Sequence, residues 1–207
     1  MNRNQLANVL LTLSLSIATG TTLADERRAF KPKPIEAYAA RQTIDGLTIA
    51  AEPFETEQKT REAFGKLNPN RYGILPVLVL MRNDSGKTVD LSSMRVEYVR
   101  PDGRRLPAIP PEEVPYYRGA DRPRLTPRVP YPLPGRTGGQ RRNPLEAEEI
   151  QIRAFSARML PPGESAYGFF YFHTASHTGA CLYIVGIEDT STRQPWFYFE
   201  IPLSAPR

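Results

Sequence analysis

Three residues toward the C-terminal end of the chain have the types and spacing of a metal site. His173, His177 and Cys181 follow one another at intervals of four residues. On a helix these side chains would share one face, and imidazole and thiolate ligands together suit Zn²⁺ or Cu⁺. The residues between them, 174–176 and 178–180, are instead typical of a loop that joins two strands. The local sequence therefore favours two loop histidines and a buried thiol, and a metal-handling protein or enzyme is the alternative.

Other residues of catalytic type lack the setting that catalysis needs. Cys181 begins the apolar run 181–185, and a thiol inside a core strand is usually inert even when a histidine is near enough to act as its base. Residues 163–168 resemble a serine nucleophile elbow, but a turn enters this segment and a strand leaves it, whereas the elbow needs a strand followed by a helix. Paired carboxylates for sugar hydrolysis would come from Glu112, Glu113, Glu146, Glu148 and Glu149, whose separation the sequence does not fix. We therefore expect neither catalytic activity nor a cofactor.

One segment, residues 107–144, is rich in proline and arginine and poor in branched apolar residues. Proline at this density opposes both helices and sheet ladders, so we expect an irregular insert. Guanidinium groups pair with carboxylates and phosphates, and tyrosines add stacking surface, so the insert is a candidate contact with an acidic partner. The candidate binding residues are Tyr116, Tyr117, Arg118, Arg122, Arg124, Arg128, Tyr131, Arg136, Arg141 and Arg142. The alternative is a disordered insertion without a role.

The first 24 residues have the layout of a secretory signal peptide. Arg3 precedes an apolar run over residues 6–17, and Thr22-Leu23-Ala24 offers small residues at a cleavage site. The apolar run is shorter than the roughly 20 residues that a membrane-spanning helix needs, which disfavours an N-terminal anchor. We therefore expect cleavage after Ala24 and an exported protein, periplasmic or secreted, without a membrane span.

Composition limits how the exported chain holds its fold and what it contacts. Cys181 is the only cysteine, so an internal disulfide is excluded and the core alone must stabilise the domain. The whole chain has a net charge of +5, and removal of the signal peptide with its single arginine leaves +4. A mild positive excess outside the cytoplasm favours an acidic protein or another envelope component as partner, and nucleic acid is not expected in that compartment.

The mature chain is a succession of short apolar runs separated by turns, a pattern that predicts strands. The runs are 38–43, 47–53, 72–81, 88–91, 94–100, 166–173, 180–188 and 196–203. Asp45-Gly46 and Asp102-Gly103 predict hairpin turns, and residues 55–66 predict one short helix. Residues 145–159 contain both helical and strand patterns. After a charged leader over 25–37, which we expect to be extended, residues 38–207 are thus predicted to form a single, mainly β domain: an antiparallel β-sandwich interrupted by the insert.

Four strand-and-turn segments occur in a suggestive order: 73–85, 99–104, 160–172 and 199–203. Together they resemble uncharacterised exported bacterial proteins with an immunoglobulin-like β-sandwich, over roughly residues 70–105 and 155–205. The resemblance implies a binding or structural role and no common active site, and the insert has no counterpart in it. We therefore expect a non-catalytic binding or scaffold domain. A third alternative, an assembly subunit that donates or receives a strand, would require an unpaired sheet edge.

Overall fold

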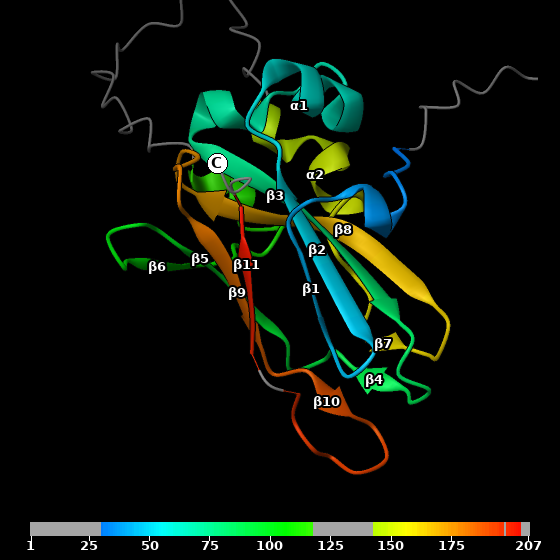
Figure 1. The fold of residues 1–207 in the computed structure, drawn as a ribbon. Coiled ribbons are helices and arrows are strands. Elements are labelled where there is room, and N and C mark those ends of the chain that lie inside the picture. Colours follow the sequence, from blue (N-terminus) through cyan, green and yellow to red (C-terminus); the bar gives the residue numbers. More distant parts are fainter. Residues whose placement is uncertain (1–29, 118–142, 197, 204–207) are drawn as a thin grey trace, which may run out of the picture.

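The computed structural model describes residues 30–117, 143–196 and 198–203 (Figure 1). Over these ranges the chain is mainly β, and its strands pair antiparallel in a sandwich, as the sequence predicts. The predicted signal peptide and most of the proline-rich insert lie outside the described residues. No helix within the described ranges is long and apolar enough to cross a membrane.

One sheet of the sandwich has four strands in the order β1-β2-β3-β8. Their bounds are Arg41–Ile44, Leu47–Pro53, Ile74–Asn83 and Ser165–His173. Strands β1 and β2 are joined at Asp45 and Gly46, which have φ angles of 47° and 81°. Asparagine, aspartate and glycine tolerate such left-handed angles, so this sequence fits a tight hairpin. The predicted hairpin is confirmed.

The second sheet has four strands in the order β11-β9-β5-β6. Their bounds are Phe199–Pro202, Cys181–Val185, Arg95–Val99 and Arg105–Pro107. The predicted turn over 101–104 joins β5 to β6. A small ladder of two-residue strands, β10-β4-β7, lies at the end of the sandwich remote from the helices (Figure 1), and its bounds are Glu188–Asp189, Val89–Asp90 and Met159–Leu160.

Strand β3 is buried on both faces, which explains why it is the most apolar run of the described chain. Val77 and Val79 pack into a core shared with Tyr98, Leu182 and Ile201 of the second sheet. The alternate side chains of β3, such as Leu78, pack into a second core under two short helices. In β11, by contrast, the buried and exposed residues alternate as the sequence predicts.

The helical layer covers one end of the first sheet (Figure 1). Helix α1 (Glu57–Phe64) confirms the predicted helix, and its N-cap Thr56 accepts a hydrogen bond from the Lys59 amide at 3.3 Å. Helix α2 (Glu148–Ile152) shows that the expectation of a single helix was wrong. Four 3₁₀ turns, η1 to η4, complete the described elements, at Ile35–Ala37, Pro69–Tyr72, Val114–Tyr117 and Pro144–Glu146.

The C-terminal part of the predicted leader belongs to the fold. The Phe30 ring lies 5.7 Å from the Phe54 ring and 5.5 Å from the Phe169 ring, measured between centroids. Ile35 is buried in the second core and begins the turn η1. Residues 30–37 are therefore not a free extension, because their two large apolar side chains cover the outer face of the first sheet.

Within the described residues, two of the sheet edges are covered. The outer edge of β8 pairs through Phe169, which donates to the Arg153 carbonyl at 2.8 Å, and through Tyr171, whose carbonyl accepts from Ile109 at 2.8 Å. At the edge of β11, the Glu200 amide donates to the side-chain oxygen of Gln42 in β1 at 2.8 Å. These contacts disfavour strand exchange at either edge.

Candidate functional site

Each of the three residues with metal-ligand spacing contacts a different neighbouring side chain. His173 ends β8 and packs edge-on against Tyr117, with 5.4 Å between ring centroids. His177 lies in the following loop, where its backbone amide donates to the Tyr98 hydroxyl at 2.9 Å. Among the described residues, no group of three or more histidine, cysteine, aspartate or glutamate side chains is placed to hold a metal ion.

Cys181 begins β9 and is half-buried. Its thiol donates to Glu200 Oε1 at 3.4 Å. Burial, and then the neighbouring carboxylate, raise the pKa of Cys181 to about 11. Because the thiolate is both the nucleophile and the metal ligand, a thiol that stays protonated at neutral pH is suited to neither role. An unreactive thiol is what the sequence favours, but the expectation that Cys181 lies in the core is wrong, because the core-facing residues of β9 are Leu182 and Ile184.

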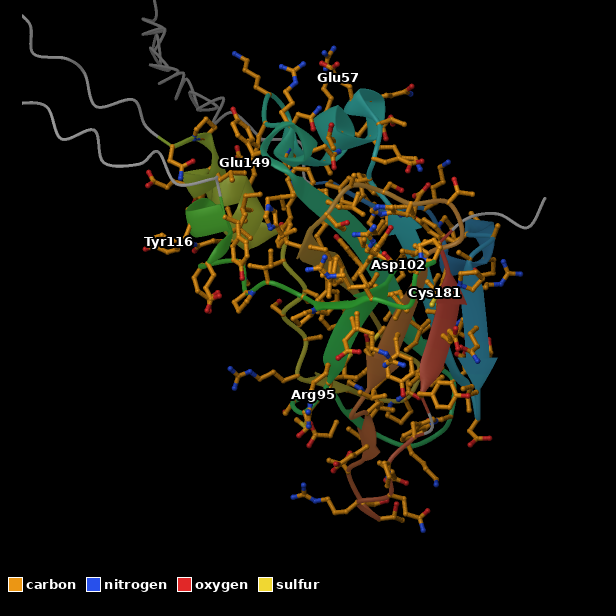
Figure 2. All side chains as sticks on the ribbon, turned by 90° about the vertical axis from the view of Figure 1, so that its left-hand side faces the viewer. Glu57, Arg95, Asp102, Tyr116, Glu149 and Cys181 are labelled. Carbon is orange, nitrogen blue, oxygen red and sulfur yellow. The ribbon has the colours of Figure 1, made fainter. Side chains whose placement is uncertain are left out.

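The other candidate catalytic residues are also in structural settings. Residues 163–168 turn the chain into β8, which begins at Ser165, so this segment is not a nucleophile elbow. Glu112 and Glu113 precede η3, while the three remaining glutamates lie on η4 and α2. Figure 2 shows Glu149 on the same side of the molecule as Tyr116. These glutamates therefore border the two ends of the insert.

The predicted irregular insert, residues 107–144, is ordered at both ends: residues 107–117 and 143–144 belong to the domain and are fastened to each other. The Asn143 side-chain amide donates to the Pro115 carbonyl at 2.9 Å, and its oxygen accepts from the Leu145 amide at 3.1 Å. Val114 and Leu145 are buried in the second core, which fixes η3 and η4 to the domain. The residues on either side of 118–142 are therefore held next to each other on the folded body.

Two of the candidate binding residues lie at this base. Tyr116 is 81% exposed, and Tyr117 packs against His173. The other eight lie outside the described residues: Arg118, Arg122, Arg124, Arg128, Tyr131, Arg136, Arg141 and Arg142. Tyr116 therefore exposes its ring to solvent at the base of the insert, whereas Val114 is buried in the core.

Charge is divided unevenly between residues 118–142 of the insert and the described residues. Residues 118–142 hold seven arginines and one aspartate, a net charge of +6. The described residues hold 16 basic and 19 acidic side chains, a net charge of −3. The basic character of the chain therefore comes from the insert, and the body beside it is slightly acidic.

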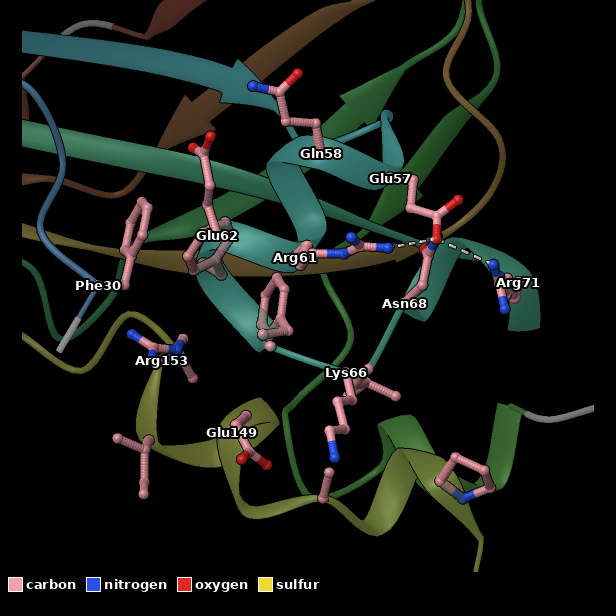
Figure 3. Close-up of a pocket in the computed structure, with 18 of the residues that line it drawn as sticks. Phe30, Glu57, Gln58, Arg61, Glu62, Lys66, Asn68, Arg71, Glu149 and Arg153 are labelled. Atoms are coloured by element: carbon pink, nitrogen blue, oxygen red, sulfur yellow. Dashed lines mark hydrogen bonds and ion pairs between the residues drawn. The ribbon is translucent and has the colours of Figure 1, made fainter. Parts of the chain in front are cut away.

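A cleft that the sequence does not predict lies between the helical layer and β8 (Figure 3). Its volume is about 1610 Å³, above the usual range of about 300–1,000 Å³ for small-molecule pockets. Phe64 and Phe169 contribute to its floor, and Ile152 and Tyr167 stand at its walls although they are 66% and 50% exposed. Two large apolar side chains of the cleft therefore remain open to solvent.

Basic side chains line the same cleft. Arg61 and Arg71 each lie 3.2 Å from one oxygen of Glu57, so one carboxylate is shared by two guanidinium groups. The Arg153 guanidinium lies 5.7 Å from the centre of the Phe30 ring. Lys31 and Lys66 add two more cations, whereas Glu62 and Glu149 are the other acidic residues of the lining. The lining as a whole has five basic and three acidic side chains.

Sequence reasoning missed these residues because most of them belong to the predicted helix or to the ambiguous segment 145–159. The available signal was the density of charged residues over 55–71 around few apolar ones, which marks an exposed face but no cavity. No protein-family model matches this chain, and no curated protein is similar to it.

Proposed function

We propose that this chain is an exported, non-catalytic binding or scaffold protein that contacts an acidic partner through its proline- and arginine-rich insert, residues 107–144. The observation that carries the proposal is the fastened base of the insert. The hydrogen bond from Asn143 to the Pro115 carbonyl, 2.9 Å long, joins the two flanks of residues 118–142, a segment of net charge +6, on a body that is stabilised by its own core. Arginine forks are suited to carboxylates and phosphates, so the chemistry of the segment selects an anionic partner.

The charge of the folded body also favours the insert as the surface that contacts the partner. Its own net charge of −3 gives an acidic partner less attraction than the net charge of +6 on residues 118–142 does. Tyr116, 81% exposed at the base, supplies an aromatic surface beside the arginines. The partner is then an acidic protein or an acidic envelope polymer, and nucleic acid is not part of the proposal.

Export and family resemblance complete the proposal. Residues 1–24 are proposed to act as a signal peptide that is removed after Ala24, which places the protein in the periplasm or outside the cell. The sandwich is proposed to be of the immunoglobulin-like kind that binds or scaffolds other molecules. N-terminal sequencing of the protein recovered from the cell envelope tests the cleavage site directly.

A deletion of residues 118–142 tests the role of the insert, because a short glycine-serine linker can join residues whose neighbours are already hydrogen-bonded. We expect the deleted protein to fold with unchanged circular dichroism and to lose the partners that the full-length mature protein captures from envelope extract. Capture of the same partners by both forms, in equal amounts, would exclude the insert as the contact surface.

A further inference from the structure

The cleft between α1, α2 and β8 combines features that the proposed role of the insert does not use. Its apolar walls come from three separate parts of the chain: Ile152 at the end of α2, Tyr167 on β8 and Phe30 in the N-terminal segment. The Tyr167 hydroxyl donates to the Phe30 carbonyl at 3.4 Å, which links two of these walls. Solvent-exposed apolar side chains that face one concave space are typical of a ligand site.

Cations surround the apolar walls. Figure 3 shows Lys66 extending from the end of α1 into the space above α2, and Arg153 beside Phe30 on the other side of that space. Within the described ranges neither Lys31 nor Lys66 forms an ion pair. Glu57 is already shared by Arg61 and Arg71. The cleft therefore offers positive charge to a ligand that brings its own negative group.

The backbone at the cleft disfavours an extended peptide. Peptides that bind to sheets pair with a free strand edge. Here the Phe169 amide donates to the Arg153 carbonyl at 2.8 Å, and the Phe169 carbonyl accepts from the Phe155 amide at 3.1 Å. Both backbone groups of Phe169 are thus occupied, and the site must recognise its ligand through side chains.

We infer that this cleft binds an anionic amphiphile with a single alkyl chain. The chain lies against Phe30, Ile152 and Tyr167, and the anionic group is paired by cations of the lining, among them Lys66. Burial of the alkyl chain supplies the affinity, and the cations select the sign of the headgroup. Of the insert, only Pro144 is among the described residues of the lining, and the two proposals rest on different residues, so either stands if the other fails.

Isothermal titration of the purified mature protein with monomeric dodecanoate tests the inference, with dodecyltrimethylammonium as a ligand of the same chain length and opposite charge. We expect one dodecanoate per protein and no comparable binding of the cation. Ile152→Glu, at a position already 66% exposed, should weaken dodecanoate about tenfold or more, because a carboxylate then stands in the apolar wall. Lys66→Glu should also weaken it, and should leave the fold unchanged because Lys66 is exposed.

Met159→Glu is the matched control, because Met159 is an apolar residue 58% exposed on β7 and does not line the cleft. It should bind dodecanoate as the unmodified protein does, and so should the form that lacks residues 118–142. The inference is overturned by absence of dodecanoate binding, by equal binding of both detergents, by equal loss in the Met159 and Ile152 variants, or by loss on deletion of the insert.

Discussion

Gly168→Ala is expected to lower the free energy of unfolding by about 3 kcal/mol, at the upper end of the range for overpacked cores. A methyl group at Gly168 would lie 2.4 Å from the Cα atom and 2.6 Å from the backbone nitrogen of Phe155. Since two backbones meet here, no side chain can rotate away. The segment at Phe155 must move away from β8, which breaks the hydrogen bonds that hold Arg153 and Phe155 to Phe169.

Denaturant unfolding of the two proteins measures this effect, and a thermal midpoint lower by roughly 6–12 °C should accompany it in a domain of this size. Gly163→Ala is the control. Gly163 has a φ angle of 78° but no atom within 4 Å of the added methyl group, so only the left-handed conformation costs about 1 kcal/mol. If the two substitutions lower the free energy of unfolding by the same amount, the close approach at Gly168 does not constrain the fold.

Asn83→Ala is expected to destabilise the protein by a similar amount, about 3 kcal/mol, through unsatisfied buried carbonyls. The fully buried Asn83 amide donates to the Leu160 carbonyl at 2.8 Å and to the Lys87 carbonyl at 2.6 Å. Its oxygen accepts from the Ser85 hydroxyl at 2.6 Å. This one side chain therefore fastens the turn after β3 to strand β7.

Asn83→Asp tests the hydrogen bonds alone, because aspartate has nearly the shape of asparagine but lacks its amide donor. An ionised aspartate cannot donate and would face the Leu160 and Lys87 carbonyls with an acceptor, whereas the protonated form can donate once. The aspartate variant should therefore be less destabilised, relative to the unmodified protein, as the pH falls through the pKa of the new carboxyl. Unfolding at two pH values measures this difference. Equal destabilisation at both would mean that these carbonyls do not need a donor.

Local signals along the sequence predict most of the sandwich. Asp45 and Gly46 predict the hairpin because both residues accept positive φ angles. The alternation of apolar and polar residues predicts β11, in which buried and exposed residues alternate. The unbroken apolar run at β3 predicts a buried strand. The helical layer covers the second face of β3. Its position depends on packing between residues that are distant in the sequence, so no local pattern predicts it.

The segment with Ile150 and Ile152 shows why the cleft was not predicted. Alternation of these residues suits a strand, in which both side chains would share one face. In α2 they point in different directions: Ile150 is fully buried, and Ile152 is 66% exposed in the wall of the cleft. The Tyr171 hydroxyl donates to the Ile150 carbonyl at 2.7 Å, so a residue of β8 holds this helix in place. The spacing of His173, His177 and Cys181 would matter only on a helix, and the chain forms there the loop between two strands that the sequence favours.

The most direct test of the proposed function is the fluorescence anisotropy of labelled poly-glutamate, titrated with the mature protein and with the form lacking residues 118–142. The full-length mature protein is expected to bind at low salt and to release the polymer at high salt, where the Debye length falls from about 10 Å at 0.1 M to about 3 Å at 1 M. The deleted form, without the segment of net charge +6, is expected not to bind. Equal binding by the two forms would contradict the account.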